Sequence, residues 1–318
     1  MLFADLRFEV TEALPEAVSG GGRLRIAAWL FAPEPNDLPE RPAVVACLAG
    51  GTYDRRYYHI EIPGHPGYSM AEYLARRGSI VLVLDHLGIG ESSRPAVQSL
   101  LTRDVVATAN HSALQQAYRK LAAGDLAPRL SPLADFAKIG VGHSLGAMQI
   151  VTQQARFGTY DRICVLGYTA VGVHFDAGGR KVAAPVGVFA DVEAPDYTLA
   201  ERAPLRRVFH WDDVPDAVLR ADDALNVETP RLLGAQSITQ GIITEDAAIV
   251  TAPVFICLGE RDVSVDARAE PGCYAASNDV SLLILPHSAH CQNFASTRQI
   301  MWDRIQWWSE LPNERTCA

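Results

Sequence analysis

A serine stands between two glycines at the point where a strand-like apolar run gives way to a helix-like one. Residues 138–150 read KIGVGHSLGAMQI, with Ser144 two positions after Gly142 and two before Gly146. This G-x-S-x-G pattern is typical of a nucleophile elbow, a strand–turn–helix that holds a serine hydroxyl above a sheet. Phosphate-binding loops do not fit, because Gly146 comes one position late for G-x-G-x-x-G and no G-K-[ST] is present. We therefore predict that Ser144 is a nucleophile.

Two later stretches carry side chains that could activate this serine. A serine hydroxyl is a poor nucleophile unless an imidazole takes its proton and a carboxylate orients that imidazole. Asp262 lies four residues after the apolar run VFICL, and His290 follows the run SLLIL within PHSAHCQNF. Together with Ser144 they would form a Ser-His-Asp triad. Asp266 and His287 are the alternative acid and base at the same two places.

The reaction would also need two backbone N–H groups to hold the negative charge that develops on a carbonyl oxygen. Leu145 could supply one, because the first N–H groups of a helix have no partner within the helix. We expect the second from the loop AGGTYD, residues 49–54, whose two glycines let the backbone approach a ligand closely. We favour Gly51, with Thr52 as the neighbouring choice.

Thr52, Tyr53 and His143 stand beside these positions, and Trp211 stands in the stretch 171–247; all four are candidates for contact with a substrate. No metal site is expected, because the nine histidines are dispersed and none forms H-E-x-x-H. We expect the chemistry to need no cofactor.

The elements that must position these residues are visible as short apolar runs separated by helical stretches. Strands that are apolar throughout have both faces covered, as in a parallel sheet flanked by helices. Alternation of such strands with helices predicts an α/β protein with a doubly wound, mostly parallel sheet. The residues at 6–10 and 23–31 predict a hairpin at its start. The core strands are expected at 43–48, 80–84, 139–141, 163–166, 254–258 and 281–285, and the helices at 68–77, 97–121, 147–157 and 302–311.

Residues 171–247 break this rhythm. They are dotted with prolines, show no strong strand, and have one helical stretch at 213–225. We expect an insertion or helical cap between two core strands. The domain prediction is therefore a core in two parts, residues 1–170 and 248–318, with the cap at 171–247.

Taken together, these motifs resemble those of the α/β-hydrolase superfamily of esterases, lipases and epoxide hydrolases. The resemblance covers nearly the whole chain. Five short sequences carry it: LAGGTYD, LDHLGIGES, GHSLG, GERD and PHSAH. It implies the α/β-hydrolase fold and a Ser-His-Asp hydrolase whose cap covers the substrate pocket.

The resemblance also favours one acid and one base. The superfamily's histidine lies several residues past the last core strand, after small residues, which favours His290. Some relatives take the acid from the position after the sixth strand, but that position reads GYTAVG here, which favours Asp262. Ser144 argues against haloalkane dehalogenases and epoxide hydrolases, which carry aspartate at the elbow. One departure is Ala49-Gly50, where His-Gly is usual.

Bulk composition limits the function classes. The 318 residues are enough for one large domain with an insertion, and 48% hydrophobic residues are ordinary for a globular protein. A net charge of −9 without a basic stretch argues against nucleic acid. No run of 18 apolar residues predicts a membrane span, and no signal peptide is expected. Six scattered cysteines suit a reducing cytoplasm.

The sequence thus predicts a cytoplasmic serine hydrolase that cleaves a small-molecule carboxylic ester or lactone through an acyl-enzyme. Two alternatives stay open, since fold alone does not fix chemistry. One is non-hydrolytic or C–C bond-cleaving chemistry on the same triad. The other is a ligand-binding protein that turns over slowly. A homodimer is also left open.

Overall fold

The computed structural model describes residues 1–176, 179–184 and 195–311. Across this part of the chain an eight-stranded sheet forms the centre, in the order β1-β2-β4-β3-β5-β6-β11-β12. All neighbours from β4 to β12 are parallel, while β2 pairs antiparallel with both β1 and β4. The predicted doubly wound sheet is confirmed. The strands are β1 Leu2–Glu9, β2 Arg25–Ala32, β3 Ala43–Leu48, β4 Ile80–Leu84, β5 Ala137–His143, β6 Arg162–Leu166, β11 Val254–Arg261 and β12 Val280–Ala289.

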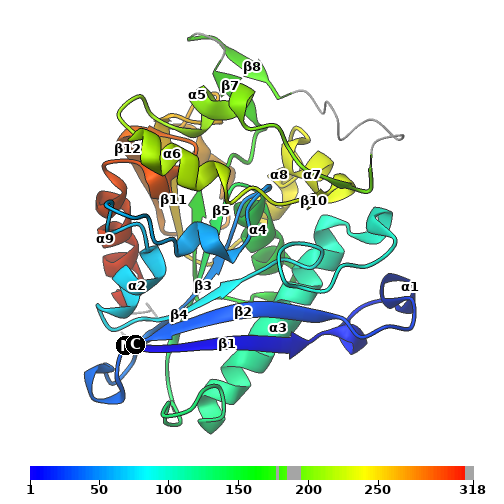
Figure 1. The fold of residues 1–318 in the computed structure, drawn as a ribbon, viewed down its shortest axis with the longest axis vertical. Helices are drawn as coiled ribbons and strands as arrows, with labels where there is room; N and C mark the ends of the chain where they lie inside the picture. Colours follow the sequence, from blue (N-terminus) through cyan, green and yellow to red (C-terminus); the bar gives the residue numbers. More distant parts are fainter. Residues whose placement is uncertain (177–178, 185–194, 312–318) are drawn as a thin grey trace.

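Helices cover both faces of this sheet (Figure 1). Alternate residues of β3 enter two separate hydrophobic clusters, with Val44 and Ala46 on one side and Val45 and Cys47 on the other. The first cluster is completed by α3 and α4, and the second by α2 and α9. Burial on both faces is why these strands read as continuous apolar runs. The helices named here are α2 Met70–Ala75, α3 Arg103–Ala123, α4 Leu145–Phe157 and α9 Arg298–Glu310.

The structure moves several predicted helix boundaries, and capping explains two of them. The stretch expected to be helical from residue 97 is a short 3₁₀ turn at Gln98–Leu100 followed by α3. Helix α3 starts where the Thr102 hydroxyl accepts a hydrogen bond from the Val105 N–H, which satisfies one unpaired helix donor. It ends at Gly124, whose positive φ an L-residue would adopt at a cost.

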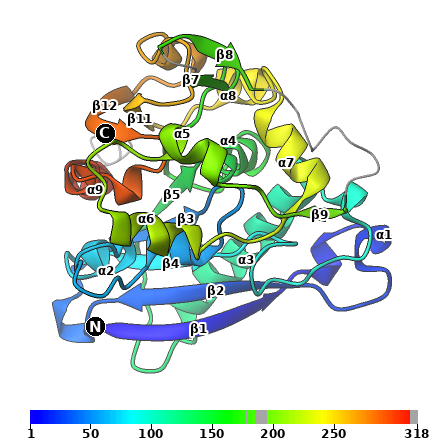
Figure 2. The same ribbon diagram turned by 45° about the horizontal axis from the view of Figure 1, so that its top comes forward.

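Residues 171–247, which we call the inserted segment, run between β6 and β11. Two short antiparallel strand pairs occur there, β7 His174–Asp176 with β8 Lys181–Ala183, and β9 Tyr197–Thr198 with β10 Thr229–Pro230. The rest includes α5 Arg206–Phe209, α6 Asp216–Asp223, α7 Arg231–Ile238 and α8 Thr244–Ile249. In Figure 1, α5, α6 and the β7–β8 pair lie toward the top of the view, and Figure 2, in which that end comes forward, shows α5 and α6 in front of the core.

Parts of the predicted domains fall outside the described residues, namely 177–178 and 185–194 of the inserted segment and 312–318 at the end of the core. Within the described part of the chain, no helix combines the length and the hydropathy that a membrane span requires.

Candidate active site

Ser144 occupies a strained turn between β5 and α4. Its φ of 54° and ψ of −121° lie in a region that L-residues rarely adopt. The two flanking glycines allow this turn because the chain passes close to itself. A Cβ on Gly142 would lie 2.3 Å from the Gly146 carbonyl oxygen, and one on Gly146 would lie 2.0 Å from the carbonyl oxygen of Leu48. Real Cβ atoms essentially never approach so closely, so both positions require glycine.

The structure brings Ser144, His290 and Asp262 into one hydrogen-bonded row. The Ser144 Oγ atom lies 3.0 Å from His290 Nε2, and His290 Nδ1 lies 2.8 Å from Asp262 Oδ1. Because an ionised carboxylate only accepts hydrogen bonds, Nδ1 must carry the ring proton. Nε2 is then free to accept the serine proton. This is the arrangement that a general base for Ser144 requires.

Three further N–H groups fix the Asp262 carboxylate. Its Oδ1 accepts a hydrogen bond from the Val263 N–H at 2.8 Å. Its Oδ2 accepts one from the Gly259 N–H at 2.9 Å and one from Gln292 Nε2 at 3.0 Å. The carboxylate is buried and cannot rotate without losing these bonds, so its orientation toward His290 is set in advance.

The alternative acid and base lie elsewhere. Asp266 is exposed and accepts a hydrogen bond from the backbone N–H of Arg268. His287 is exposed, and its ring stacks on Trp211 with centroids 6.0 Å apart. Neither contacts Ser144, so the geometry agrees with the choice of Asp262 and His290.

Two backbone N–H groups beside Ser144 have no partner among the described residues, those of Leu145 and Gly51. The loop that carries Gly51 runs against the elbow, since a Cβ on Gly50 would lie 3.1 Å from Ser144 Cβ. The alternative donor, Thr52, is already engaged, because its N–H donates to Thr229 Oγ1 at 2.9 Å. The structure therefore favours Gly51 over Thr52.

His143 contacts the backbone of the proposed base, His290. Its Nε2 donates to the backbone carbonyl oxygen of His290 at 2.8 Å, and its ring stacks on Tyr57 with centroids 4.6 Å apart. Burial, reinforced by the nearby His290, lowers the pKa of His143 to about 3. The residue is 1% exposed. Its main contact is thus with the loop that holds His290, although it also borders the pocket.

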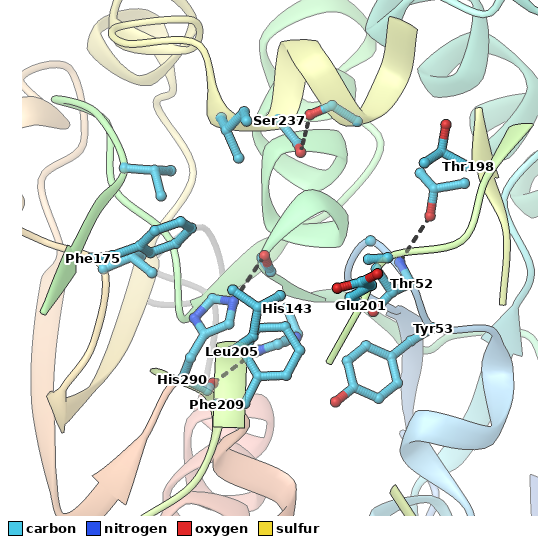
Figure 3. Close-up of a pocket in the computed structure, with 18 of the residues that line it drawn as sticks. Thr52, Tyr53, His143, Phe175, Thr198, Glu201, Leu205, Phe209, Ser237 and His290 are labelled. Carbon is cyan, nitrogen blue, oxygen red and sulfur yellow. Dashed lines mark hydrogen bonds between the residues drawn. The ribbon is translucent and has the colours of Figure 1, made fainter. Parts of the chain in front are cut away.

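A cavity of about 530 Å³ opens above Ser144 and His290. Figure 3 shows Phe175, Leu205 and Phe209 around His290, with Thr52 and Tyr53 across the pocket. The inserted segment supplies most of the lining. The apolar lining residues from that segment are Val173, Phe175, Leu199, Ala200, Pro204, Leu205, Phe209 and Ile238.

Of the predicted substrate contacts, Thr52, Tyr53 and His143 line this cavity, and Trp211 does not. Trp211 packs against the Arg261 guanidinium, 4.6 Å from its ring centroid, and against His287. The prediction for Trp211 is therefore not supported by its position. Sequence reasoning missed Phe209, whose carbonyl accepts a hydrogen bond from the Cys291 N–H. No sequence pattern marked this pairing of the inserted segment with the histidine loop.

The described residues hold no group of three or more histidine, cysteine, aspartate or glutamate side chains arranged to bind a metal ion.

No protein-family model matches the chain, and no curated protein matches its sequence. Solved structures do match. An esterase from Exiguobacterium antarcticum superposes with a TM-score of 0.66 at 14% identity, over 91% of this chain and 97% of that one. A lipase in its open form gives 0.64 at 18% identity, over 97% and 98%. The E-2-(acetamidomethylene)succinate hydrolase gives 0.59 at 17% identity, over 98% and 100%. At these identities the likeness concerns the fold.

Proposed function

The chain has the α/β-hydrolase fold, and we propose that it is a serine hydrolase that cleaves a carboxylic ester or its cyclic form, a lactone. One observation carries the proposal. At the strained elbow, the Ser144 hydroxyl, the His290 ring and the Asp262 carboxylate are hydrogen-bonded in sequence at 3.0 and 2.8 Å. A backbone conformation as strained as that of Ser144 persists only where the surrounding structure enforces it, most often at a functional site.

In the proposed reaction these three residues act first in acylation of Ser144 and then in deacylation. Ser144 Oγ attacks the ester carbonyl carbon while His290 Nε2 takes its proton, and Asp262 stabilises the resulting imidazolium. The N–H groups of Leu145 and Gly51 hold the oxyanion of the tetrahedral intermediate. His290 then returns the proton to the leaving alkoxide, which departs as the alcohol and leaves an acyl-serine. A water molecule, deprotonated by His290, releases the acid by the same steps in reverse.

The cavity lining supports an uncharged, apolar acyl or alcohol group. Among the described residues that line it, no lysine or arginine is present, and Glu201 is the single carboxylate. The hydroxyl groups of Tyr168, Ser237 and Thr198 already donate to backbone carbonyl oxygens. A carboxylate on the substrate would lose its hydration shell there without gaining a cation, which costs several kcal/mol. An alkyl chain would be buried favourably, at about 0.8 kcal/mol for each methylene.

A matched pair of esters tests both the activity and this polarity. The p-nitrophenyl ester of hexanoic acid and the mono-p-nitrophenyl ester of adipic acid differ by a methyl group against a carboxylate. We expect kcat/KM for the hexanoate to exceed that for the adipate by about a hundredfold or more, because the carboxylate must be desolvated. Glu201→Gln should reduce the ratio of the two kcat/KM values only about a fewfold, because the charge of an exposed carboxylate is largely screened.

The same samples test the reaction class. A fluorophosphonate should label the wild type and not Ser144→Ala. Hydrolysis of simple aliphatic lactones, followed by proton release, compares cyclic with open esters. Absence of labelling together with absence of turnover on every ester and lactone would overturn the proposed function. Equal kcat/KM for the hexanoate and adipate esters would leave the hydrolase intact and refute the polarity of its pocket.

A further inference from the structure

The inserted segment buries a charged cluster that no step of the proposed reaction uses. Asp222, near the end of α6, is 0% exposed. Its carboxylate accepts hydrogen bonds from the Tyr53 hydroxyl at 2.7 Å and from His210 Nε2 at 2.8 Å, and lies 3.0 Å from Arg202 Nη1. Arg202 is also buried, with its guanidinium carbon 4.1 Å from the Tyr53 ring centroid. We call Asp222, Arg202, His210 and Tyr53 the Asp222 cluster.

A buried ion pair of this kind contributes little net stability to a fold. Removing a carboxylate and a guanidinium from water costs several kcal/mol for each, and their mutual attraction often only offsets that cost. Burial opposes ionisation of Asp222, but the hydrogen bond from His210, the positive charge of Arg202 and the hydrogen bond from Tyr53 outweigh it and lower its pKa. Asp222 and Arg202 therefore stay charged, and the contacts of the cluster show which part of the chain it holds in place.

The cluster holds Thr52, the residue after the proposed oxyanion donor Gly51. Arg202 Nη2 donates to the Thr52 carbonyl oxygen at 2.8 Å and lies 3.0 Å from its Oγ1. The same carbonyl accepts a hydrogen bond from the Val227 N–H at 3.0 Å, and the Thr52 N–H donates to Thr229 Oγ1 at 2.9 Å. All the polar atoms of Thr52 thus bond to residues of the inserted segment.

These contacts oppose a local strain. Thr52 has a φ of 68°, and a β-branched residue is disfavoured in this left-handed region. Without outside partners the loop would relax to another backbone conformation. The next residue, Tyr53, is held by the same carboxylate through its hydroxyl. Asp222 therefore anchors two successive loop residues, one directly and one through Arg202.

The direction of the Gly51 N–H depends on this loop conformation. A Cβ on Gly51 would lie 3.6 Å from Leu145 Cδ1, which places the loop against the start of α4 beside Ser144. The Gly51 N–H belongs to the Gly50–Gly51 peptide group, and the next peptide group, Gly51–Thr52, has its N–H bonded to Thr229. Because these two peptide groups share the Gly51 Cα, a shift of the loop at Thr52 would displace the Gly51 N–H. Oxyanion donors act only within a narrow range of distance and direction.

We propose that Asp222, acting through Arg202 and Tyr53, is a positioning residue that holds the loop 49–53 with the Gly51 N–H directed at the oxyanion. This inference rests on the proposed function, because it assigns the loop an oxyanion role. Its consequence is that docking of the inserted segment and completion of the oxyanion hole are one event. The segment then contributes to the chemical step as well as to the pocket wall.

The test compares two adjacent aspartates of α6. Asp222→Asn removes the charge and one acceptor from the cluster while keeping its shape. Asp223→Asn is the matched control, because Asp223 is exposed and pairs with Arg206 at 2.7 Å, away from the loop. Loss of one oxyanion donor typically costs about 10²–10³ in kcat. We expect Asp222→Asn to lower kcat by about 10–100-fold with KM within about threefold, and Asp223→Asn to leave both within about twofold.

A second readout separates positioning from mere stability. A trifluoromethyl ketone adds to the active serine to form an oxyanion, so its affinity reports the oxyanion hole. Its affinity should fall by the same factor as kcat/KM in Asp222→Asn. If Asp222→Asn does not fold, Arg202→Lys takes its place, since lysine keeps the charge beside Asp222 but lacks the fork that bonds Thr52.

The outcomes are separable. A folded Asp222→Asn, or Arg202→Lys in its place, with unchanged kcat and inhibitor affinity overturns the inference, even if it melts at a lower temperature. Equal losses in Asp222→Asn and Asp223→Asn also overturn it. If the wild type and Asp223→Asn neither turn over esters nor react with a fluorophosphonate, the proposed function itself has failed.

Discussion

Acid should destabilise this protein through two histidines that the fold keeps neutral. His143 is buried behind His290, and its Nδ1 has no hydrogen-bond partner among the described residues. His86 is buried with its Nε2 2.9 Å from the Ala49 carbonyl oxygen. Burial lowers the pKa of His143 to about 3 and that of His86 to about 4. A proton on either ring would put an unsolvated charge in the core.

The sign and size of the effect follow from these values. In the unfolded chain both histidines titrate near their ordinary pKa of about 6.5. Stability is therefore fully present above about pH 6.5 and is lost as the pH falls, because only the unfolded state binds the protons. At about pH 4.5 each histidine costs about 2.5 kcal/mol, or about 5 kcal/mol together, against a typical total of about 5–15 kcal/mol.

One carboxyl acts in the opposite direction. Burial, only partly offset by the charge of Arg55, raises the pKa of Asp85 to about 6. Its folded form therefore gains a proton before its unfolded form does. This returns about 2 kcal/mol of stability by about pH 4.5. The three groups together should thus cost about 3 kcal/mol, and a variant is needed to isolate one of them.

His143→Gln isolates one histidine, because glutamine can donate to the His290 carbonyl oxygen but does not titrate. Urea unfolding of both proteins at about pH 7.5 and about pH 4.5 gives four free energies. The variant should be less stable at neutral pH, but its further loss on acidification should be about 2.5 kcal/mol smaller than that of the wild type. If both proteins lose the same free energy, His143 is not held neutral by the fold and the reasoning is refuted.

Three substitution experiments test the proposed triad. Ser144→Ala should lower ester turnover to a small residual rate at an unchanged melting temperature, and more than a few per cent of wild-type kcat would remove Ser144 as the nucleophile. Asp262→Asn should lower kcat by about 10⁴-fold through the wrong imidazole tautomer, whereas Asp266→Asn should stay within about twofold; a larger loss at Asp266 would reverse the assignment. His290→Ala should abolish both turnover and fluorophosphonate labelling, while His287→Ala keeps both; the opposite pattern would identify His287 as the base.

Much of the core fold could be predicted from the sequence because its causes are local. Strands buried on both faces must be apolar throughout, so β3, β4 and β11 were recognisable as runs of residues. The elbow was recognisable because the chain tolerates no Cβ at Gly142 or Gly146. Parallel strands end at the same edge of a sheet, so polar residues after separate runs could be expected to meet. The structure does place Asp262 and His290 in contact there.

The choice between neighbouring candidates within the site came from tertiary contacts. The Thr52 N–H is taken by Thr229, 177 residues later in the chain, which leaves the N–H of Gly51. Trp211 could be expected to line a pocket, but packing against Arg261 and His287 places it outside. Neither the choice of Gly51 nor the position of Trp211 could be predicted from a local sequence pattern. Each depends on contacts with residues that are distant in the sequence.

The inserted segment shows this limit most clearly. Its residues have no period that predicts where they dock, since short elements joined by prolines take their positions from packing rather than from propensity. The sequence by itself determined the order of the core elements and the side chains at the ends of its strands. Tertiary structure alone decided that Asp222 would be buried against Tyr53, 169 residues earlier, and that Arg202 would reach Thr52. The physical reason is that a buried charge is tolerated only where distant partners converge on it, and convergence is a property of the assembled fold.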